Sequence, residues 1–336
     1  MKAAIFESEG KVAIKNVPIP EIRKSDDVML KVLASSICGT DLHILNVPPS
    51  FEAKQGVVLG HEYVGEVMDV GAGVTDLDVG QRVVINPNLS CGLCEYCRMG
   101  KPNICENLVS IGLDIDGGLA EYSVVPRSSL FNISSDLPLG TAVIAEPISC
   151  VMSAIRKVMP EPGESAVVLG AGPIGVLFTK FFLAQGLKEI YVSDPIEYRR
   201  AYAEGLGVAG VLDPNVDDVG KVVKDKTGIG ADIVVDAAGT LINTSLDCVR
   251  WGGRVLLFGL STTSFSSLQQ FYISRYDITV FGTFIANSTF PATVNVIEDG
   301  VLDLQSMVSH EIKLEDIVEG VDLLRTGKAI KIVVYP

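Results

Sequence analysis

The residues of this chain that are best suited to chemistry lie in two short segments near the N-terminus. Cys38-Gly-Thr40-Asp-Leu-His43 is the first and Gly60-His61-Glu62 is the second, in a chain of 336 residues with only three histidines. A thiolate, an imidazole and a carboxylate are ligands that a catalytic zinc ion takes while one position stays open for water or substrate. These residues are therefore candidates for a catalytic metal site.

Each candidate also has a purely structural interpretation. Cys38 would serve as a small buried apolar side chain, His61 as a core histidine with satisfied nitrogens, and Glu62 as a hydrated acid. Glu146, a further candidate acid before a proline near an expected domain junction, has the same alternative. Taken singly, the structural interpretations are preferred, but two other motifs of the chain favour the chemical one.

The first of these motifs is a cluster of four cysteines. Cys91, Cys94 and Cys97 are separated by two residues each, and Cys105 follows eight residues later. Two-residue gaps let successive thiolates point at one tetrahedral centre, and four sulfurs fill a zinc shell without an open position. Disulfides and an iron–sulfur cluster are the alternatives, but an odd total of seven cysteines without an export signal favours a structural zinc ion.

The second motif is rich in glycine and follows an apolar strand. It consists of Gly170, Gly172, Pro173, Ile174 and Gly175, and it opens a helical run over 176–184. The first glycine makes the turn, the second lets the backbone approach a pyrophosphate, and the third lets the helix pack closely. The pattern predicts a dinucleotide site at the helix N-terminus. An ordinary strand-to-helix turn is the alternative.

An acid after the next strand strengthens the dinucleotide interpretation. Asp194 lies 19 residues after Gly175, where a carboxylate accepts hydrogen bonds from ribose hydroxyls and repels a 2′-phosphate. The sequence therefore favours NAD over NADP. Arg199 and Arg200 complicate this choice, because they lie near the expected adenosine ribose or else on a hydrated helix face.

The order of apolar segments predicts two kinds of domain. Short strands separated by turn residues fill the first 140 residues or so and indicate a mostly β domain. Strands and helices alternate from Ser165, as in a doubly wound parallel sheet. The expected strands of the first region are 28–34, 63–70, 82–85 and 121–125, and those of the second are 166–169, 190–193, 210–212, 233–236, 255–258 and 278–281.

The end of the chain contains two further helical stretches, over 291–298 and 315–325, and a final strand over 330–334. If that strand pairs back with the first domain, the second domain is an insertion. We therefore expect a zinc domain over 1–145 and 284–336, and a nucleotide domain over 146–283.

The bulk composition excludes several classes of protein. A formal charge of −14 disfavours nucleic acid and anionic membrane surfaces as partners. No apolar run has the roughly 18 residues that a membrane span needs, and the N-terminus lacks a signal peptide. We expect a cytoplasmic protein with no nucleic-acid or membrane partner.

The chain resembles the medium-chain zinc-dependent dehydrogenases from end to end. Gly60-His61-Glu62 with Gly65-Glu66-Val67, the four cysteines and the glycine motif occur in the order of that family. The resemblance implies an α/β chain in which a Rossmann doubly wound parallel sheet is inserted in a mostly β, GroES-like catalytic domain. It also implies two zinc ions per chain and a nicotinamide cofactor, NAD.

The resemblance carries roles to particular residues. It implies that Cys38, His61 and Glu62 bind the catalytic zinc, with Glu146 beside the metal as an alternating ligand or water anchor. Thr40 and His43 match the family's proton relay from the alcohol to solvent. Zinc lowers the pKa of the bound alcohol and the carbinol hydride passes to the nicotinamide.

The substrate is less well determined. Cys38-Gly-Thr40-Asp and Glu146-Pro147 are similar to polyol dehydrogenases and to threonine 3-dehydrogenases, but the sequence over 148–153 matches neither fully. We expect oxidation of a polyol or another secondary alcohol to the ketone, with a hydroxy amino acid such as threonine as the alternative substrate. A non-catalytic NAD-binding zinc protein is a third hypothesis, although such a protein would not need the complete set of site residues.

The resemblance also implies a homodimer or homotetramer, because family members pair through the last strand of the nucleotide domain. That strand is expected here over 278–281, and its exposed edge needs a cover.

Overall fold

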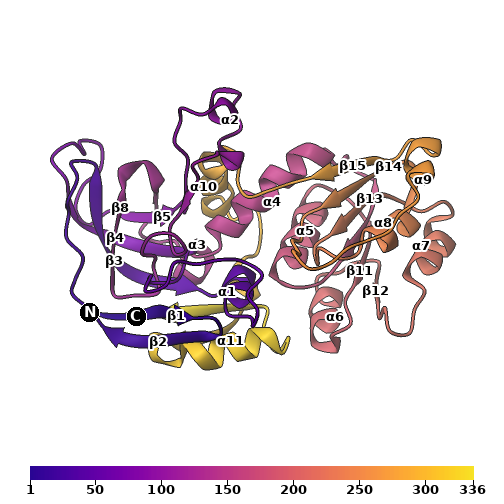
Figure 1. The fold of residues 1–336 in the computed structure, drawn as a ribbon. Coiled ribbons are helices and arrows are strands. Elements are labelled where there is room, and N and C mark those ends of the chain that lie inside the picture. Colours follow the sequence, from indigo (N-terminus) through magenta and orange to yellow (C-terminus); the bar gives the residue numbers. More distant parts are fainter. The chain divides into compact units, whose positions relative to one another are not determined.

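A computed structural model describes residues 1–336 and divides the chain into two compact units (Figure 1). Unit 1 contains residues 1–149 and 286–336, and unit 2 contains residues 150–285. The second unit is therefore an insertion between two segments of the first. The structure contains no helix with the length and apolar character that a bilayer crossing demands.

Unit 1 is built on a mostly antiparallel seven-stranded sheet. Its strands follow the order β16-β17-β3-β4-β5-β9, and β8 pairs with β3 off this path. They are β3 (Asp27–Ser36), β4 (Tyr63–Val70), β5 (Arg82–Ile85), β8 (Tyr122–Pro126), β9 (Leu130–Ile133), β16 (Val308–Lys313) and β17 (Lys331–Tyr335). The last strand of the chain pairs with β3, as the sequence predicts, through Ser36 opposite Val333 and Ser35 opposite Val334.

Smaller elements complete unit 1. Two further pairs of strands are β1 (Lys2–Ser8) with β2 (Lys11–Asn16) and β6 (Asn88–Leu89) with β7 (Val109–Ser110). The helices are α1 (Gly39–Ile44), α2 (Glu95–Arg98), α3 (Leu139–Ala142), α10 (Phe290–Glu298) and α11 (Ile317–Arg325), and α4 (Ala145–Val158) crosses from unit 1 into unit 2. Short 3-10 turns are η1 (Pro102–Ile104), η2 (Arg127–Ser129), η3 (Gln305–Met307) and η4 (Leu314–Asp316).

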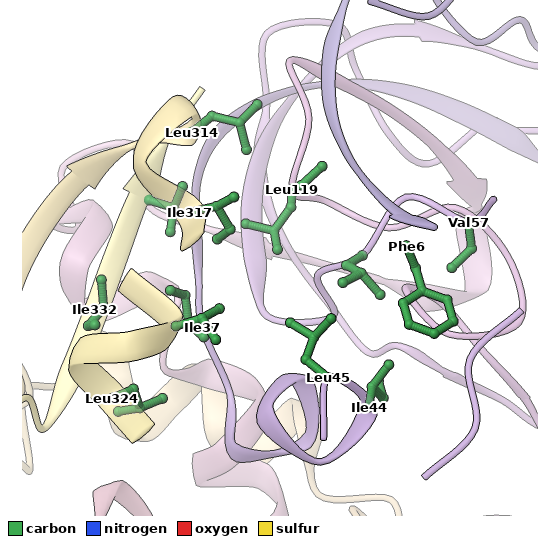
Figure 2. Packing of buried hydrophobic residues seen from close by; sticks show 14 of the residues in the cluster. Phe6, Ile37, Ile44, Leu45, Val57, Leu119, Leu314, Ile317, Leu324 and Ile332 are labelled. Atoms are coloured by element: carbon green, nitrogen blue, oxygen red, sulfur yellow. The ribbon is translucent and has the colours of Figure 1, made fainter. Parts of the chain in front are cut away.

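An apolar core joins the two ends of unit 1. Ile37 and Ile44 from the start of the chain pack in one cluster with Leu314, Ile317 and Ile332 from its end (Figure 2). The Ile37 side chain is fully buried, and its amide donates to the Ile332 carbonyl over 3.2 Å. This core therefore fixes the segment on either side of Ile37 against β17.

Unit 2 is a parallel six-stranded sheet. Its order, β12-β11-β10-β13-β14-β15, reverses direction beside β10 and is that of a doubly wound Rossmann fold. The strands are β10 (Ser165–Leu169), β11 (Glu189–Ser193), β12 (Gly210–Leu212), β13 (Ala231–Asp236), β14 (Val249–Leu257) and β15 (Thr279–Gly282). The helices are α5 (Pro173–Ala184), α6 (Glu197–Glu204), α7 (Val219–Thr227), α8 (Ile242–Cys248) and α9 (Gln270–Arg275).

The helix that follows the first strand of unit 2 is buried along most of its length. Phe178, at its centre, is fully buried and lies 5.2 Å from the Phe258 ring and 6.0 Å from the Phe182 ring, measured between ring centroids. A helix that is apolar on nearly all sides has to lie in the interior, because it has no polar face for water. Helix α5 thereby holds its N-terminus at the carboxyl end of β10.

All ten strands expected in the two regions are present, with ends that differ by a few residues. The largest difference is in β14, which begins at Val249 although the sequence predicts a start at residue 255. Gly252 and Gly253 suggest a turn there, but the backbone continues through an irregularity in the pairing with β13. Glycine in a strand often marks such a bulge, so the prediction of a later start was wrong.

Candidate active site, structural metal site and dinucleotide loop

The two short N-terminal segments converge in unit 1. Sγ of Cys38, a nitrogen of His61 and a carboxylate oxygen of Glu62 all lie within 4.8 Å of one another. Cys38 directly precedes α1, whereas His61 and Glu62 directly precede β4. Strands β3 and β4 are antiparallel neighbours, so the end of one and the start of the other bring the three side chains together.

Gly60 allows the close approach of the second segment. Its φ of +95° lies in the left-handed region, and a Cβ there would be 2.7 Å from the Leu119 backbone nitrogen. Glycine is the residue that adopts this conformation without a steric cost. It therefore lets the chain turn directly before His61.

The three side chains fit a metal ion by chemistry and by hydrogen bonding. Glu62 uses Oε2 to accept from Ser36 and Lys331, while its Oε1 is buried without a hydrogen-bond partner. Buried polar atoms rarely stay unpaired. An unpaired carboxylate oxygen beside a thiol and an imidazole therefore indicates a metal ligand. Glu146 is buried in the first turn of α4 but does not join this group.

Asp41 is a buried acid that the sequence reasoning quoted but did not assign. Its Oδ2 accepts from the Cys38 amide over 2.8 Å, and its Oδ1 lies 3.7 Å from Nδ1 of His61. Burial by itself would lower the pKa of His61. The nearby Cys38 and then Asp41 raise it by more, so the pKa of His61 lies well above its ordinary value. Asp41 thus acts on the imidazole through its charge at ion-pair distance, without a hydrogen bond between Oδ1 and Nδ1.

Lys331 is the other residue that the sequence did not indicate. It lies on β17, its side chain is 2% exposed, and Nζ forms an ion pair with Glu62. Burial by itself would raise the pKa of Glu62, but Lys331 and then His61 outweigh burial, so the pKa of Glu62 lies below its ordinary value. Glu62 is therefore a carboxylate, the form in which it binds a cation.

Thr40 and His43 lie beside this group on α1. Thr40 Oγ1 is 3.8 Å from Sγ of Cys38, and the His43 ring meets the Phe51 ring edge-on at 5.6 Å between centroids. Nδ1 of His43 is buried without a hydrogen-bond partner, and burial lowers the pKa of this histidine. A neutral imidazole is suited to accepting a proton.

The four cysteines of the second candidate metal site also converge. Cys91, Cys94, Cys97 and Cys105 place their sulfurs within 4.8 Å of one another, and Sγ of Cys105 lies 3.5 Å from Sγ of Cys91 and 3.9 Å from Sγ of Cys94. Sulfurs at about 2.3 Å from a tetrahedral zinc ion are about 3.8 Å apart. All seven cysteines are free thiols, so these four are available as ligands.

The glycine motif of unit 2 forms the loop between β10 and α5. Gly170 has a φ of +102°, and a Cβ on Gly175 would lie 1.7 Å from the Gly170 carbonyl oxygen, so only glycine fits at the third position. Gly172 is the N-cap of α5, and Pro173 and Ile174 begin the helix. The motif thus places free helix amides at the carboxyl end of the sheet, where anions bind.

Asp194 lies next to this loop and is 2% exposed. Its Oδ2 accepts from the Ala171 amide and its Oδ1 from the Ile196 amide, each over 2.8 Å. Arg199 places Nη1 3.8 Å from Oδ2 of Asp194, whereas Arg200 pairs with Asp213. Asp194 therefore supports the loop itself, in addition to the ribose role that the sequence suggests for it.

Comparison with known proteins agrees with this arrangement. The family model of the alcohol dehydrogenase GroES-like domain matches residues 24–135, and that of the zinc-binding dehydrogenases matches residues 173–299. L-threonine 3-dehydrogenase of Caldanaerobacter subterraneus subsp. tengcongensis is 34% identical over 98% of this chain and 97% of its own length. Sorbitol dehydrogenase of Bacillus subtilis is 28% identical over 100% of this chain and 97% of its own.

A solved structure is similar over the whole chain. The putative zinc-binding dehydrogenase of Sinorhizobium meliloti 1021, bound to NADP, has a TM-score of 0.92 and 31% identity, and the match covers 100% of this chain and 99% of that one. The chain belongs to the zinc-dependent medium-chain alcohol and polyol dehydrogenase family. It is accordingly an oxidoreductase that acts on an alcohol group with a nicotinamide dinucleotide.

Proposed function

We propose that the protein oxidises a polyol or another secondary alcohol to the ketone with NAD, at a zinc ion held by Cys38, His61 and Glu62. The convergence of these three side chains, with Oε1 of Glu62 buried and unpaired, is the observation that supports this proposal. Three protein ligands leave a fourth position for the substrate oxygen. Glu146 is proposed as a neighbouring acid that anchors water or replaces a ligand.

Bound zinc would supply the charge that stabilises an alkoxide. The protein's own part is to hold the ligands and to move a proton. Asp41 lies 3.7 Å from His61 and is proposed to polarise it, and Thr40, near Cys38, is proposed to pass the alcohol proton toward His43. His43 is suited to this step because burial lowers its pKa, so that its imidazole is neutral and free to accept a proton at neutral pH.

In unit 2, the loop with Gly170, Gly172, Pro173, Ile174 and Gly175 is proposed to bind the pyrophosphate. Asp194 and Arg199 are proposed to lie at the adenosine ribose, and the acid favours NAD. A second zinc ion is proposed at the four cysteines, where it holds the lobe over 86–110 together.

Threonine, or another hydroxy amino acid, is the second candidate substrate. The similarity to threonine 3-dehydrogenases, at 34% identity, favours it. Sorbitol, xylitol, butanediol and threonine should therefore each be offered with NAD while the absorbance of the reduced cofactor is followed. Turnover of threonine alone would refute the polyol assignment, and turnover of none would refute both.

A histidine pair provides a matched control for the metal assignment. His61→Asn should abolish activity and lower the zinc content from two ions per chain to one, since the four-cysteine site is untouched. His310→Asn changes the third histidine, which lies on β16 beside Ser309, and should leave both values unchanged. Full activity of the His61 variant would reject the proposed catalytic site.

We also propose that a second copy of the chain covers the edge strand β15. Strand β15 has one neighbour, β14, and exposed aromatic side chains of the same unit include Trp251, Phe271 and Tyr272. An unpaired strand edge beside apolar surface favours self-association into a dimer or tetramer. Light scattering should give a mass at least twice that of the chain, and a monomer would refute this part.

The cytoplasm is the proposed location. Seven free thiols, four of them in one metal-binding cluster, support a reducing compartment.

A further inference from the structure

Lys331 carries a charge in a place where water cannot reach it. Its side chain is 2% exposed on β17, and Nζ contacts the Glu62 carboxylate and lies 3.5 Å from the Ile37 carbonyl oxygen. A buried ammonium group is costly unless it is paired and hydrogen-bonded. The ion pair with Glu62 is the interaction that offsets this cost.

The two oxygens of Glu62 have different surroundings. Oε2 accepts from Nζ of Lys331 and from Oγ of Ser36, whereas Oε1 has no hydrogen-bond partner although it is buried. A carboxylate held through one oxygen cannot turn freely about its terminal bond. The free oxygen stays in the group formed with Cys38 and His61.

The charge of Lys331 also matches an excess of acids around it. Glu62 is paired with Lys331, and Glu146 is another buried acid of unit 1. Asp41, a further buried acid, lies beside His61. Buried carboxylates repel one another strongly because the protein interior has a low dielectric constant. The ammonium group of Lys331 offsets part of this repulsion.

We propose that Lys331 is a positioning residue of the catalytic metal centre: together with Ser36 it holds Oε2 of Glu62, so that Oε1 remains turned toward Cys38 and His61 as a ligand. This inference rests on the metal site of the proposed function. It assigns no contact between Lys331 and the ion or the substrate. Its consequence is that a strand 269 residues away in sequence sets the metal affinity of the N-terminal ligands.

Zinc binding of the full-length protein tests this role without an activity assay. Wild type, Lys331→Met, Lys331→Arg and Lys328→Met are equilibrated with zinc buffers of graded free concentration, and bound zinc per chain is measured. Lys328 is exposed and lies three residues before Lys331, so its variant controls for loss of a lysine in the same segment. The four-cysteine site is an internal reference for folded protein.

Lys331→Met should raise the free zinc needed to half-fill the site of Cys38, His61 and Glu62 by about 10- to 100-fold, the usual effect of removing a partner behind a metal ligand. The four-cysteine site and the Lys328 variant should not change. Lys331→Arg should bind zinc more tightly than Lys331→Met, because it keeps the charge and its donors. An arginine variant that binds no better than the methionine variant overturns the proposal.

Two further results decide the remaining cases. If Lys331→Met does not fold, Ser36→Ala removes the other donor to Oε2 without leaving a buried charge, and should weaken zinc binding in the same direction. Unchanged affinity in Ser36→Ala, or in folded Lys331→Met, overturns the proposal while the proposed function stands. A wild-type protein that binds only one zinc ion rejects the catalytic metal site, and this inference with it.

Discussion

Replacement of Asp194 with glycine tests two roles of one carboxylate, support of the glycine loop and binding of the cofactor ribose. In the folded protein Asp194 accepts from the amides of Ala171 and Ile196, each over 2.8 Å, and it lies 3.8 Å from the Arg199 guanidinium. The proposed function adds the second role, in which the same group accepts from the ribose of NAD. The substitution removes all of these interactions at once.

The stability effect follows from the two backbone hydrogen bonds. A hydrogen bond to a charged acceptor contributes about 1.5–3 kcal/mol, so the loss of two sets an upper range of about 3–6 kcal/mol. Glycine leaves space in which water can reach the two amides, so the observed loss should fall toward the lower end. Urea unfolding without cofactor measures this part alone.

The cofactor effect is measured as a ratio. Loss of a ribose hydrogen bond of about 1.5–3 kcal/mol corresponds to about 10- to 140-fold weaker use of NAD. Use of NADP should fall less, because no carboxylate then repels the 2′-phosphate and Arg199 is released to pair with it. The ratio of kcat/KM for NAD to that for NADP should therefore drop in the Asp194→Gly variant.

A control at another aspartate makes the result decisive. Asp277 is exposed in the same unit and has a φ of +54°, a conformation that suits glycine, so Asp277→Gly should preserve both the stability and the cofactor ratio. If Asp194→Gly lowers the stability but leaves the cofactor ratio unchanged, the carboxylate only supports the loop. The ribose role would then be refuted.

Three other changes test the rest of the structure. Cys94→Ser should reduce bound zinc from two ions to one and lower the melting temperature, whereas two retained ions would contradict the four-cysteine site. Phe178→Ala empties a fully buried position and should cost about 3–5 kcal/mol in urea unfolding, and a loss below about 1 kcal/mol would show that the site is not packed as described. Burial raises the pKa of Cys248 to about 12. The folded state thus favours the neutral thiol, and this group lowers the free energy of unfolding above about pH 8.5 by at most about 1.4 kcal/mol per pH unit. The Cys248→Ala variant should lack this contribution, whereas Cys38 and Tyr63, whose pKa values burial also raises, still contribute.

Local patterns were sufficient to predict the strands of unit 2 and the helix after the glycine motif. The strand before Gly170 and the helix after Gly172 are adjacent in sequence, so their roles depend on neighbouring residues only. The four cysteines lie within 15 residues for the same reason. At the start of β14 the glycines indicate a turn. The structure instead continues the strand there, paired with β13.

The surroundings of the candidate metal site were not predictable in this way. Cys38, His61 and Glu62 were recognisable by their residue types, but Lys331 stands in an ordinary apolar strand with no signal of its own. Its position depends on the pairing of β17 with β3, which joins the two ends of unit 1. Asp41 lay inside a recognised motif, yet its burial against His61 follows from packing that a single sequence does not reveal.

The pairing of β17 with β3 has a consequence for the newly made chain. The thiol, imidazole and carboxylate leave the ribosome early, whereas the lysine that anchors Glu62 follows 269 residues later. At about 5–20 residues per second, translation of that stretch takes about 15 to 55 seconds. Only while residues 286–331 are added, for about 2 to 9 seconds, does the inserted unit have all of its sequence while the first unit still lacks β17. A nascent chain stalled before residue 331 should therefore contain a formed dinucleotide fold beside an immature metal pocket.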